Sequence, residues 1–322
     1  MVGAVVIGRN EGERLRVCLQ SLANKVSCLV YVDSGSTDHS LEIAESLGVL
    51  VVNLDMVVPF TAARARNEGF EALKRNCSGI HFVQFVDGDC EVVEGWLDAA
   101  SHALQHQNDL AVVCGRRRER FPEKSIYNQL CDIEWDTPVG EADACGGDAL
   151  IRANAFEQVG GYNPGLIAGE EPEMCVRLRR NGWKILRMDA EMTLHDADMQ
   201  RFSQWWNRMV RAGHAFSEVS NMHRGSLFRI WRREEKSNWL WDLSLPVVLI
   251  GSFFWQWTLV CLFIYPLQIL RIARYSYPHR TYRDRMLFAI FCMLGKLPLM
   301  LGQFRYLWAR ISGRKKRIIE YK

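Results

Sequence analysis

The chain has 322 residues, a hydrophobic fraction of 48% and a formal net charge of +3 at pH 7. This length allows one large domain with an appendage, or two modest domains. So small a net charge excludes the strongly basic character of a typical nucleic-acid-binding protein, and we expect no nucleic-acid partner.

Neither the cysteines nor the start of the chain indicates an oxidising compartment. The ten cysteines are scattered, without a Cys-x-x-Cys pair or the clustered spacing of a zinc site. The first nine residues form a short apolar run that charge interrupts early, so no signal peptide is predicted. We therefore expect a reducing, cytosolic setting for the main domain, with the cysteines acting as small buried hydrophobic side chains.

Short β-branched runs alternate with helix-like stretches in the first half of the chain. The pattern predicts strands at 4–7, 28–32, 49–53 and 81–86, separated by helices at 11–22, 40–47 and 62–74. Beyond residue 111 the pattern is mixed, with strands at 112–114 and 184–188 and a helix at 171–181. Alternation of this kind indicates βαβ units around a mostly parallel sheet, as in an α/β fold.

Polar segments follow three of the predicted strands. Segment 9–11 follows the first strand, 33–38 the second and 87–89 the fourth. Ligands of parallel sheets bind beyond the carboxyl ends of the strands, so these segments mark the expected site. The first two segments also fit plain strand-to-helix turns, in which Asn10 or a residue of 36–38 caps the next helix.

The segment 87–89, Asp-Gly-Asp, carries the central chemical signal. Asp87 and Asp89 are two carboxylates separated by one small residue at a strand end, and such a pair can hold a hard cation like Mg²⁺ or Mn²⁺. That cation can then bind the two phosphates of a nucleotide. Acidic pairs are also common in turns, so the significance of this pair depends on the neighbouring motifs.

Apolar residues dominate the C-terminal part of the chain. Leu243 to Leu270 is a stretch of 28 residues without charge, which as one helix would extend about 42 Å against roughly 30 Å of bilayer hydrocarbon. A second apolar stretch, 286–304, is interrupted by Lys296 and Pro298. Basic residues lie between the two stretches and at the end of the chain: Arg271, Arg274, Arg280, Arg283, Arg285, Arg305, Arg310, Arg314, Lys315, Lys316, Arg317 and Lys322.

The position of these basic residues bears on membrane topology. Two full spans would place the arginine-rich segment 271–285 on the far side, against the positive-inside tendency. Pro246, Pro266 and Pro298 permit bent or re-entrant helices. We therefore expect an appendage that dips into the cytoplasmic leaflet, with its basic residues on anionic headgroups. Two full spans and a buried helical hairpin of a soluble protein are the alternatives.

Taken in order, the motifs resemble those of family 2 glycosyltransferases of the GT-A fold. The resembling segments are 5–11, 32–38, 65–69, 85–89, 146–152, 156–162, 169–173 and 177–179. The resemblance covers about residues 2–200. It implies a Rossmann-like, mixed and mostly parallel sheet flanked by helices, in a nucleotide-sugar-binding catalytic domain at 1–220. A linker and a membrane-associated helical segment would follow at 221–322.

The resemblance also implies roles for individual positions on the donor side. The nucleoside would contact Arg9, Glu11 and Asp33, and the cofactor-binding set also includes Arg66 and Asp87. Asp87 would lie near the ribose and the metal-linked phosphates. A solvated basic face of the predicted helix is the alternative for Arg66.

For the metal, the resemblance implies direct ligation by Asp89, with Asp87 beside it. His195 matches a late histidine of the family that can complete the metal or diphosphate site. A purely structural role is the alternative for His195, since a lone histidine is more often a satisfied structural residue.

The catalytic base is expected within Glu170-Glu171, where the family usually has Glu-Asp. Inverting transfer needs a carboxylate that takes the proton of the acceptor hydroxyl as this hydroxyl attacks the anomeric carbon. Glu171 occupies the usual base position, although it is one methylene longer, and Glu170 is the alternative base. Both carboxylates would also favour the N-terminus of the following helix without any catalytic role.

Processive members of the family often carry a Gln-x-x-Arg-Trp motif. The segment 204–208, Gln-Trp-Trp-Asn-Arg, resembles it only loosely, because no Trp follows the Arg. This difference favours addition of a single sugar over polymer synthesis. Trp205 and Trp206 could stack on a sugar, lie at the membrane interface or pack in a core.

Together these features predict an inverting glycosyltransferase of the hexosyltransferase type that depends on Mg²⁺ or Mn²⁺. It would move a sugar from a nucleotide-sugar, with UDP favoured by the resemblance, to a lipid-linked or glycan acceptor. We expect it at the cytoplasmic face of the cell membrane, in surface polysaccharide or glycolipid biosynthesis. The alternatives are a transferase for a small soluble acceptor and a non-catalytic nucleotide-binding component of a polysaccharide assembly complex.

Overall fold

The computed structural model describes residues 1–313, and the chain divides into two compact units. The first, called the sheet unit below, consists of Met1–Phe121 and Trp135–Asp198. The second, the helical unit, consists of Pro122–Glu134 and the chain from Met199 onward. The boundary between the compact units lies at Asp198 and Met199. The division into a catalytic domain at 1–220 and a membrane-associated segment at 221–322 is a functional one and remains a prediction.

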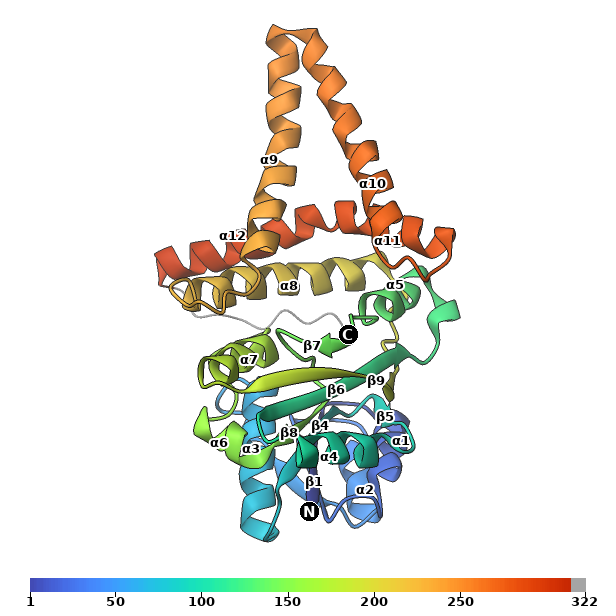
Figure 1. Ribbon diagram of the computed structural model, residues 1–322, viewed down its shortest axis with the longest axis vertical. Helices are drawn as coiled ribbons and strands as arrows, with labels where there is room; N and C mark the ends of the chain where they lie inside the picture. Colours follow the sequence, from blue (N-terminus) through green and yellow to red (C-terminus); the bar gives the residue numbers. More distant parts are fainter. Residues whose placement is uncertain (314–322) are drawn as a thin grey trace. The chain divides into compact units, whose positions relative to one another are not determined.

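The sheet unit is built on one mixed sheet with the strand order β3-β2-β1-β4-β8-β6-β9-β5, in which β7 also pairs with β9 (Figure 1). The strands are β1 Val2–Gly8, β2 Cys28–Asp33, β3 Leu50–Asn53, β4 Phe82–Asp87, β5 Cys90–Val92, β6 Leu110–Glu119, β7 Gly140–Glu141, β8 Ala149–Arg152 and β9 Lys184–His195. Strands β1 to β4 pair in parallel, as do β6 and β9, whereas β5, β7 and β8 run antiparallel to their neighbours. The mixed, mostly parallel sheet predicted from the sequence is therefore confirmed.

Helices flank this sheet and bury their apolar sides against it. They are α1 Glu13–Leu22, α2 Ser40–Ser46, α3 Ala62–Asn76, α4 Trp96–His106, α6 Ala153–Gln158 and α7 Glu170–Arg180. Helix α3 lies so close to β1 that a Cβ atom on Gly69 would stand 2.3 Å from Cγ1 of Val5. Only glycine permits that approach, which brings the start of α3 to the carboxyl edge of the sheet.

Strands β6 and β9 are longer than the strands predicted from the apolar runs in the sequence. The predicted strand at 112–114 extends to Glu119, and the one at 184–188 extends to His195. Three consecutive arginines, 116–118, lie in β6, where charged side chains are unfavourable unless they find partners. Each has one: Arg116 pairs with Asp136, Arg117 with Asp148 and Arg118 with Glu191.

The helical unit contains a long helix, α8, against which α9 and α12 pack. Its elements are η1 Pro122–Lys124, α5 Ile126–Glu134, α8 Phe202–Met222, α9 Arg232–Phe254, η2 Gln256–Phe263, α10 Ile264–Tyr275, α11 Tyr282–Leu294 and α12 Lys296–Ser312. Helices α8 and α12 touch at two glycines. A Cβ atom on Gly213 would lie 2.0 Å from the carbonyl oxygen of Leu299, and one on Gly302 would lie 2.0 Å from that of Val210.

The segment 204–208 belongs to α8 and is engaged within the helical unit. The side chain of Gln204 accepts a hydrogen bond from the N–H of Arg201 at 2.9 Å, which caps the helix. Trp205 is buried with its ring centroid 5.0 Å from that of Phe291, and Arg208 pairs with Glu134 at 2.7 Å. Packing, one of the alternatives for Trp205, is what the structure shows.

The uncharged stretch from Leu243 to Leu270 does not form one straight helix. Helix α9 ends at Phe254, Trp255 has an extended backbone, and η2 and α10 return beside α9, so that the stretch is a helical hairpin (Figure 1). By length and composition, two described segments are long and apolar enough to cross a membrane, Gln256–Tyr275 and Tyr282–Ser312. The basic residues Arg314, Lys315, Lys316, Arg317 and Lys322 lie outside the described residues.

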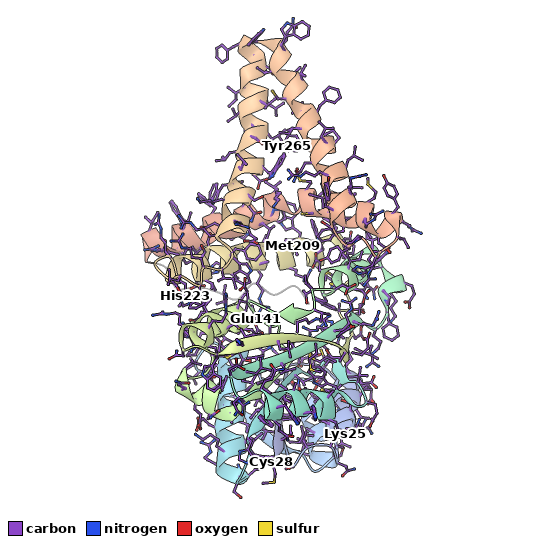
Figure 2. All side chains as sticks on the ribbon, viewed as in Figure 1. Lys25, Cys28, Glu141, Met209, His223 and Tyr265 are labelled. Carbon is purple, nitrogen blue, oxygen red and sulfur yellow. A yellow bond between two sulfur atoms is a disulfide. The ribbon has the colours of Figure 1, made fainter. Side chains whose placement is uncertain are left out.

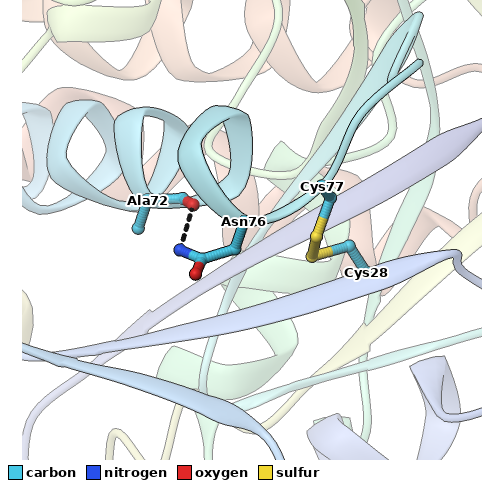
Figure 3. Close-up of a disulfide and its surroundings, with 4 residues drawn as sticks. All are labelled: Cys28, Ala72, Asn76 and Cys77. Carbon is cyan, nitrogen blue, oxygen red and sulfur yellow. Dashed lines mark hydrogen bonds between the residues drawn. A yellow bond between two sulfur atoms is a disulfide. The ribbon is translucent and has the colours of Figure 1, made fainter.

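Two of the ten cysteines form a disulfide, Cys28–Cys77, between the start of β2 and the end of α3 (Figure 3). Beside it, Asn76 donates a hydrogen bond to the carbonyl oxygen of Ala72 at 2.7 Å and completes the last turn of α3. The prediction that all ten cysteines are reduced and hydrophobic was wrong for this pair, because sequence spacing did not show that the two residues meet. A disulfide is also uncommon in a reducing compartment. Six of the other cysteines are buried as predicted: Cys18, Cys90, Cys114, Cys131, Cys145 and Cys175.

Candidate active site

The polar segments predicted to mark the site do gather at one edge of the sheet. In the parallel registers, Gly8 of β1 lies opposite Asp33 of β2, and Ile7 lies opposite Asp87 of β4. Arg9, Asp33 and Asp87 therefore all follow or end strands at the same carboxyl edge. This is the edge at which such sheets bind ligands.

Asp33 is buried, and its carboxylate is satisfied by its own turn. One oxygen accepts hydrogen bonds from the hydroxyls of Tyr31 and Ser36, at 2.8 and 2.5 Å. The other accepts the N–H groups of Gly35 and Ser36 at 2.9 and 2.8 Å. The N-caps of α1 and α2 are Gly12 and His39, so the alternative in which Asn10 or a residue of 36–38 caps the next helix is wrong. Contact with a nucleoside remains a prediction for Asp33.

Arg9 and Glu11 lie on the neighbouring loop, which is tied to the turn after β2. The guanidinium of Arg9 stands 4.9 Å from the ring centroid of Phe60, and Glu11 pairs with Arg14 at 2.8 Å. The N–H of Glu11 donates to the hydroxyl of Ser40 at 3.1 Å. Both side chains thus lie at the predicted edge, and their contact with donor remains a prediction.

Arg66 is the centre of a buried charge cluster. It is 2% exposed, and its guanidinium pairs with Asp87 at 2.8 Å, with Glu170 at 3.0 Å and with Glu171 at 2.8 Å. The alternative of a solvated basic face is therefore wrong for Arg66. Three carboxylates around one arginine carry more negative than positive charge, so the cluster favours a cation or a proton nearby.

Glu171 is a carboxylic acid of this cluster whose pKa is raised. Burial raises the pKa of Glu171 to about 7, the negative charge of Glu170 adds to the rise, and Arg66 opposes it. Gly147 leaves room beside the cluster: a Cβ atom there would lie 2.6 Å from Arg66 Nη2 and 3.3 Å from Glu171 Oε1. Any larger residue at 147 would displace the side chains that surround it.

Asp89, Cys90 and His195 form a second group, and their potential ligand atoms all lie within 4.8 Å of one another. The pairing of β5 with β9 brings them together, since Cys90 lies opposite His195. Nε2 of His195 is 3.3 Å from Oδ2 of Asp89, and Nδ1 is 3.6 Å from Glu119, a carboxylate that can orient the ring. This geometry depends on the extension of β9 to His195.

The chemistry of this group fits a hard divalent ion through two of its members. Burial, with a contribution from the charge of Arg117, lowers the pKa of His195, so the ring is neutral and free to act as a ligand. Burial also holds the pKa of the Cys90 thiol well above its ordinary value. Mg²⁺ and Mn²⁺ prefer oxygen ligands to sulfur, so the carboxylate of Asp89 fits such an ion best. The neutral ring of His195 is placed to complete the site, and Cys90 is their neighbour.

Asp87 lies between the two groups and is paired with arginines. Besides Arg66 it contacts Arg117 at 3.2 Å, and Arg117 is also 3.3 Å from Asp148 and 3.1 Å from the sulfur of Cys90. Asp87 is not a member of the compact group around Asp89 and His195. Its role as a metal ligand remains a prediction.

Three residues that shape this site, Arg117, Glu119 and Asp148, had no predicted role. Arg117 joins Asp87 to Asp148, Asp148 accepts the N–H of Asp87 at 3.2 Å, and Glu119 stands behind His195. Asp148 lies within one of the segments that carry the family resemblance. Arg117 and Glu119 lie in a charged run directly after the predicted strand at 112–114. This run was the sequence signal that could have indicated a role for them.

Comparison with known sequences identifies the family. Residues 4–160 match the sequence model described as Glycosyl transferase family 2. Residues 4–160 are therefore similar in sequence to glycosyl transferase family 2. A search among curated proteins found no match. The predicted family and the predicted glycosyltransferase activity are thereby confirmed.

One solved structure shares the fold of this chain, and two others are less similar. A mannosyltransferase from Pyrobaculum calidifontis, solved in complex with GDP-Man and Mn²⁺, is 14% identical and has a TM-score of 0.67, with 96% of this chain and 87% of that chain covered. TarS of S. aureus is 17% identical and has a TM-score of 0.47. The match covers 69% of this chain and 43% of the TarS chain. A glucosyl-3-phosphoglycerate synthase from Mycobacterium tuberculosis, solved with Mn²⁺ and UDP, is 16% identical with a TM-score of 0.47 and 79% of its chain covered. The first of these confirms the GT-A fold.

Proposed function

We propose that this family 2 glycosyltransferase is an inverting, metal-dependent hexosyltransferase. It takes a sugar from a nucleotide-sugar, and its acceptor is a lipid-linked or glycan molecule in surface polysaccharide or glycolipid biosynthesis. The observation that carries the proposal is the adjacency of two groups, one around Asp89 and His195 and one around Glu171, with Asp87 and Arg117 between them.

On the donor side, Asp89 and His195 would hold Mg²⁺ or Mn²⁺, with Asp87 close by. A bound ion of this kind supplies Lewis-acid stabilisation to the departing diphosphate. Arg9, Glu11 and Asp33 would contact the nucleoside at the same sheet edge. UDP is our preference from the family resemblance, and the Pyrobaculum calidifontis enzyme was solved with GDP-Man, so both nucleotides belong in the test.

On the acceptor side, Glu171 would take the proton of the attacking hydroxyl. A base works best when its pKa lies near the working pH, and the raised pKa of Glu171, about 7, meets that condition at neutral pH. Arg66 holds the carboxylate at 2.8 Å and fixes its position. Glu170, on the same guanidinium, is the alternative base.

The helical unit supports attachment to a membrane, which we propose to be the cytoplasmic face of the cell membrane. Many of its large apolar side chains are exposed to solvent, including those at the turn of the hairpin. Confinement beside a lipid-linked acceptor would raise the effective concentration of both reactants. The disulfide Cys28–Cys77 counts against the cytoplasmic side.

The competing proposals are a small soluble acceptor and a non-catalytic role in a polysaccharide assembly complex.

A hydrolysis screen tests this function without knowledge of the acceptor, because many transferases slowly transfer to water. The purified chain is incubated with UDP- and GDP-sugars and with Mg²⁺ or Mn²⁺, and release of free nucleotide is measured. We expect metal-dependent release from at least one donor, and loss of Mn²⁺-dependent UDP or GDP binding by calorimetry in Asp89→Ala. The control variant Asp98→Ala changes an exposed residue on α4 and should behave as wild type. Unchanged Mn²⁺-dependent binding in Asp89→Ala would contradict the metal role.

A further inference from the structure

The hairpin formed by Leu243 to Leu270 exposes its turn almost completely. Phe253 and Phe254 are each 88% exposed, Trp255 is 66% exposed and Trp257 is 67% exposed. Burying one such side chain is worth about 1.5 to 3 kcal/mol, so four of them in water are strongly unfavourable. Exposed apolar surface on this scale marks an interaction site.

The two arms of the hairpin are fastened to each other by side chains of α9 and α10. Figure 2 shows Tyr265 on α10. Its hydroxyl lies 2.8 Å from that of Ser244 and donates to the carbonyl oxygen of Trp241 at 3.0 Å, and both residues are on α9. The rings of Trp241 and Tyr265 also meet edge to face at 5.4 Å. The helical arms satisfy their own backbone groups, as a segment inside hydrocarbon must.

The length of the hairpin matches one leaflet. The uncharged part of α9, from Leu243 to Phe254, has 12 residues, so it extends about 18 Å. One leaflet contributes half of a hydrocarbon core of roughly 30 Å. A hairpin that crossed the whole bilayer would also place its turn in water, and this turn consists of aromatic residues without charge.

The base of the hairpin is basic. Arg271 and Arg274 are exposed on α10 directly after its last uncharged turn, and Arg283 is exposed at the start of α11. Long basic side chains at the end of an apolar segment reach anionic headgroups while their stems remain in the apolar region. This charge pattern fits a phospholipid surface better than an apolar protein groove.

Helix α12 presents a second apolar surface, which we call the α12 stripe: Leu297, Phe304, Trp308 and Ile311, all exposed. At 100° per residue these four positions fall within an arc of about 60°. Gly302, on the opposite side of α12, faces α8. One side of α12 is therefore packed and the other is apolar and exposed, which is the pattern of a helix that lies along an interface.

We propose that the helical unit binds one leaflet of a phospholipid bilayer in two ways. The hairpin inserts as far as the middle of the bilayer, and the α12 stripe lies flat at the headgroup boundary. Within the described residues, neither segment that is long and apolar enough to span crosses the membrane. This inference rests on the membrane attachment proposed above and adds its geometry and depth.

Spin labels in the full-length chain test this geometry. Exposed Cys261 and half-buried Cys292 are first changed to Ser, and single cysteines then replace Phe254, Trp308 or, as an aqueous control, the exposed Glu45. The labelled chain is bound to vesicles of phosphatidylcholine and phosphatidylglycerol. Collisions with oxygen, which concentrates in hydrocarbon, are compared with collisions with a water-soluble nickel chelate.

We expect the label at 254 to collide mainly with oxygen, as at the middle of the bilayer, the label at 308 to report the headgroup boundary, and the label at 45 to collide mainly with nickel. A nickel-accessible label at 254 in vesicle-bound protein would mean a full span and overturn the inference. A label at 308 with the depth of 254 would overturn the flat position of α12. Failure of the chain to sediment with these vesicles would overturn both the attachment and its geometry. The transferase activity would be unaffected by that result, because the donor hydrolysis screen tests it separately.

Discussion

The sheet unit buries charged side chains, whereas the helical unit exposes large apolar ones. Arg66, Asp89 and Glu170 are among the buried charged residues of the first, and Phe253 and Phe254 are nearly bare in the second. Each unit departs from the ordinary distribution of residues, in opposite directions. We propose that in both cases the departure marks the place where another molecule binds, the donor in the first unit and lipid in the second.

The two departures are stabilised differently. A buried charge is tolerated only when it has partners, and the sheet unit supplies them internally, since one arginine pairs with Asp87, Glu170 and Glu171. Exposed apolar side chains have no such partners within the unit, and we propose that lipid covers them. The sheet unit should therefore respond to substitution through chemistry and pH, and the helical unit through partition into lipid.

The largest effect is expected for Glu171→Gln. The change keeps the size of the side chain and removes its ability to accept a proton, so turnover should fall about 1,000-fold. Calorimetric binding of donor and Mn²⁺ should persist. Glu45→Gln, an exposed change on α2, serves as the control. If Glu170→Gln lowered turnover more than Glu171→Gln did, the base would be Glu170.

Removal of aromatic residues at the hairpin turn should have the next largest effect. Phe253→Ser combined with Phe254→Ser removes two side chains from the bilayer, and at about 1.5 kcal/mol or more each the vesicle affinity should fall roughly 100-fold. Vesicle sedimentation measures the affinity. Leu227→Ser is a matched control, because Leu227 is 95% exposed and lies in the helical unit outside the hairpin. An equal loss in the control would show that insertion at the turn is not specific.

The smallest effect is a displacement of the pH profile by Arg66→Lys. The base must be ionised, so kcat/KM of the wild type should rise with pH until about 7, the pKa of Glu171, and then level off. Arg66 lowers that pKa, and lysine lacks the forked geometry that reaches three carboxylates. The rising limb should therefore move to higher pH, by up to about one unit. A limb at the same pH in both proteins would show that Arg66 does not control the base.

The carboxyl edge of the sheet was predictable because it follows from local patterns. Parallel strands end at the same edge, so the segments after the strands at 4–7, 28–32 and 81–86 had to come together. The Asp-Gly-Asp spacing then placed Asp87 and Asp89 at that edge. Contacts between residues far apart in the sequence were less accessible. Arg66 meets Glu171 across 105 positions, and periodicity alone carries no information about such a pairing.

Three other features were hidden for separate physical reasons. Arg117 lies in a run of charges that is unfavourable for a strand, so its place in β6 depends on tertiary ion pairs with Asp87 and Asp148. The disulfide Cys28–Cys77 depends on how α3 ends beside β2. The turn at Trp255 interrupts an apolar run without glycine or proline at that position. Beside it, Thr258 donates a hydrogen bond to the carbonyl oxygen of Val248 in the other arm of the hairpin.

The glycine crossing of α8 and α12 has a mechanical consequence. Most helix contacts yield slightly when their side chains change rotamer, but at Gly213 and Gly302 the two backbones meet without intervening side chains. Lateral pressure that lipids exert on the α12 stripe would be transmitted directly to α8, because close-packed interiors transmit strain. The two helices would then move as a rigid pair. A change in lipid packing that displaces α12 would also displace α8 and the elements packed against it.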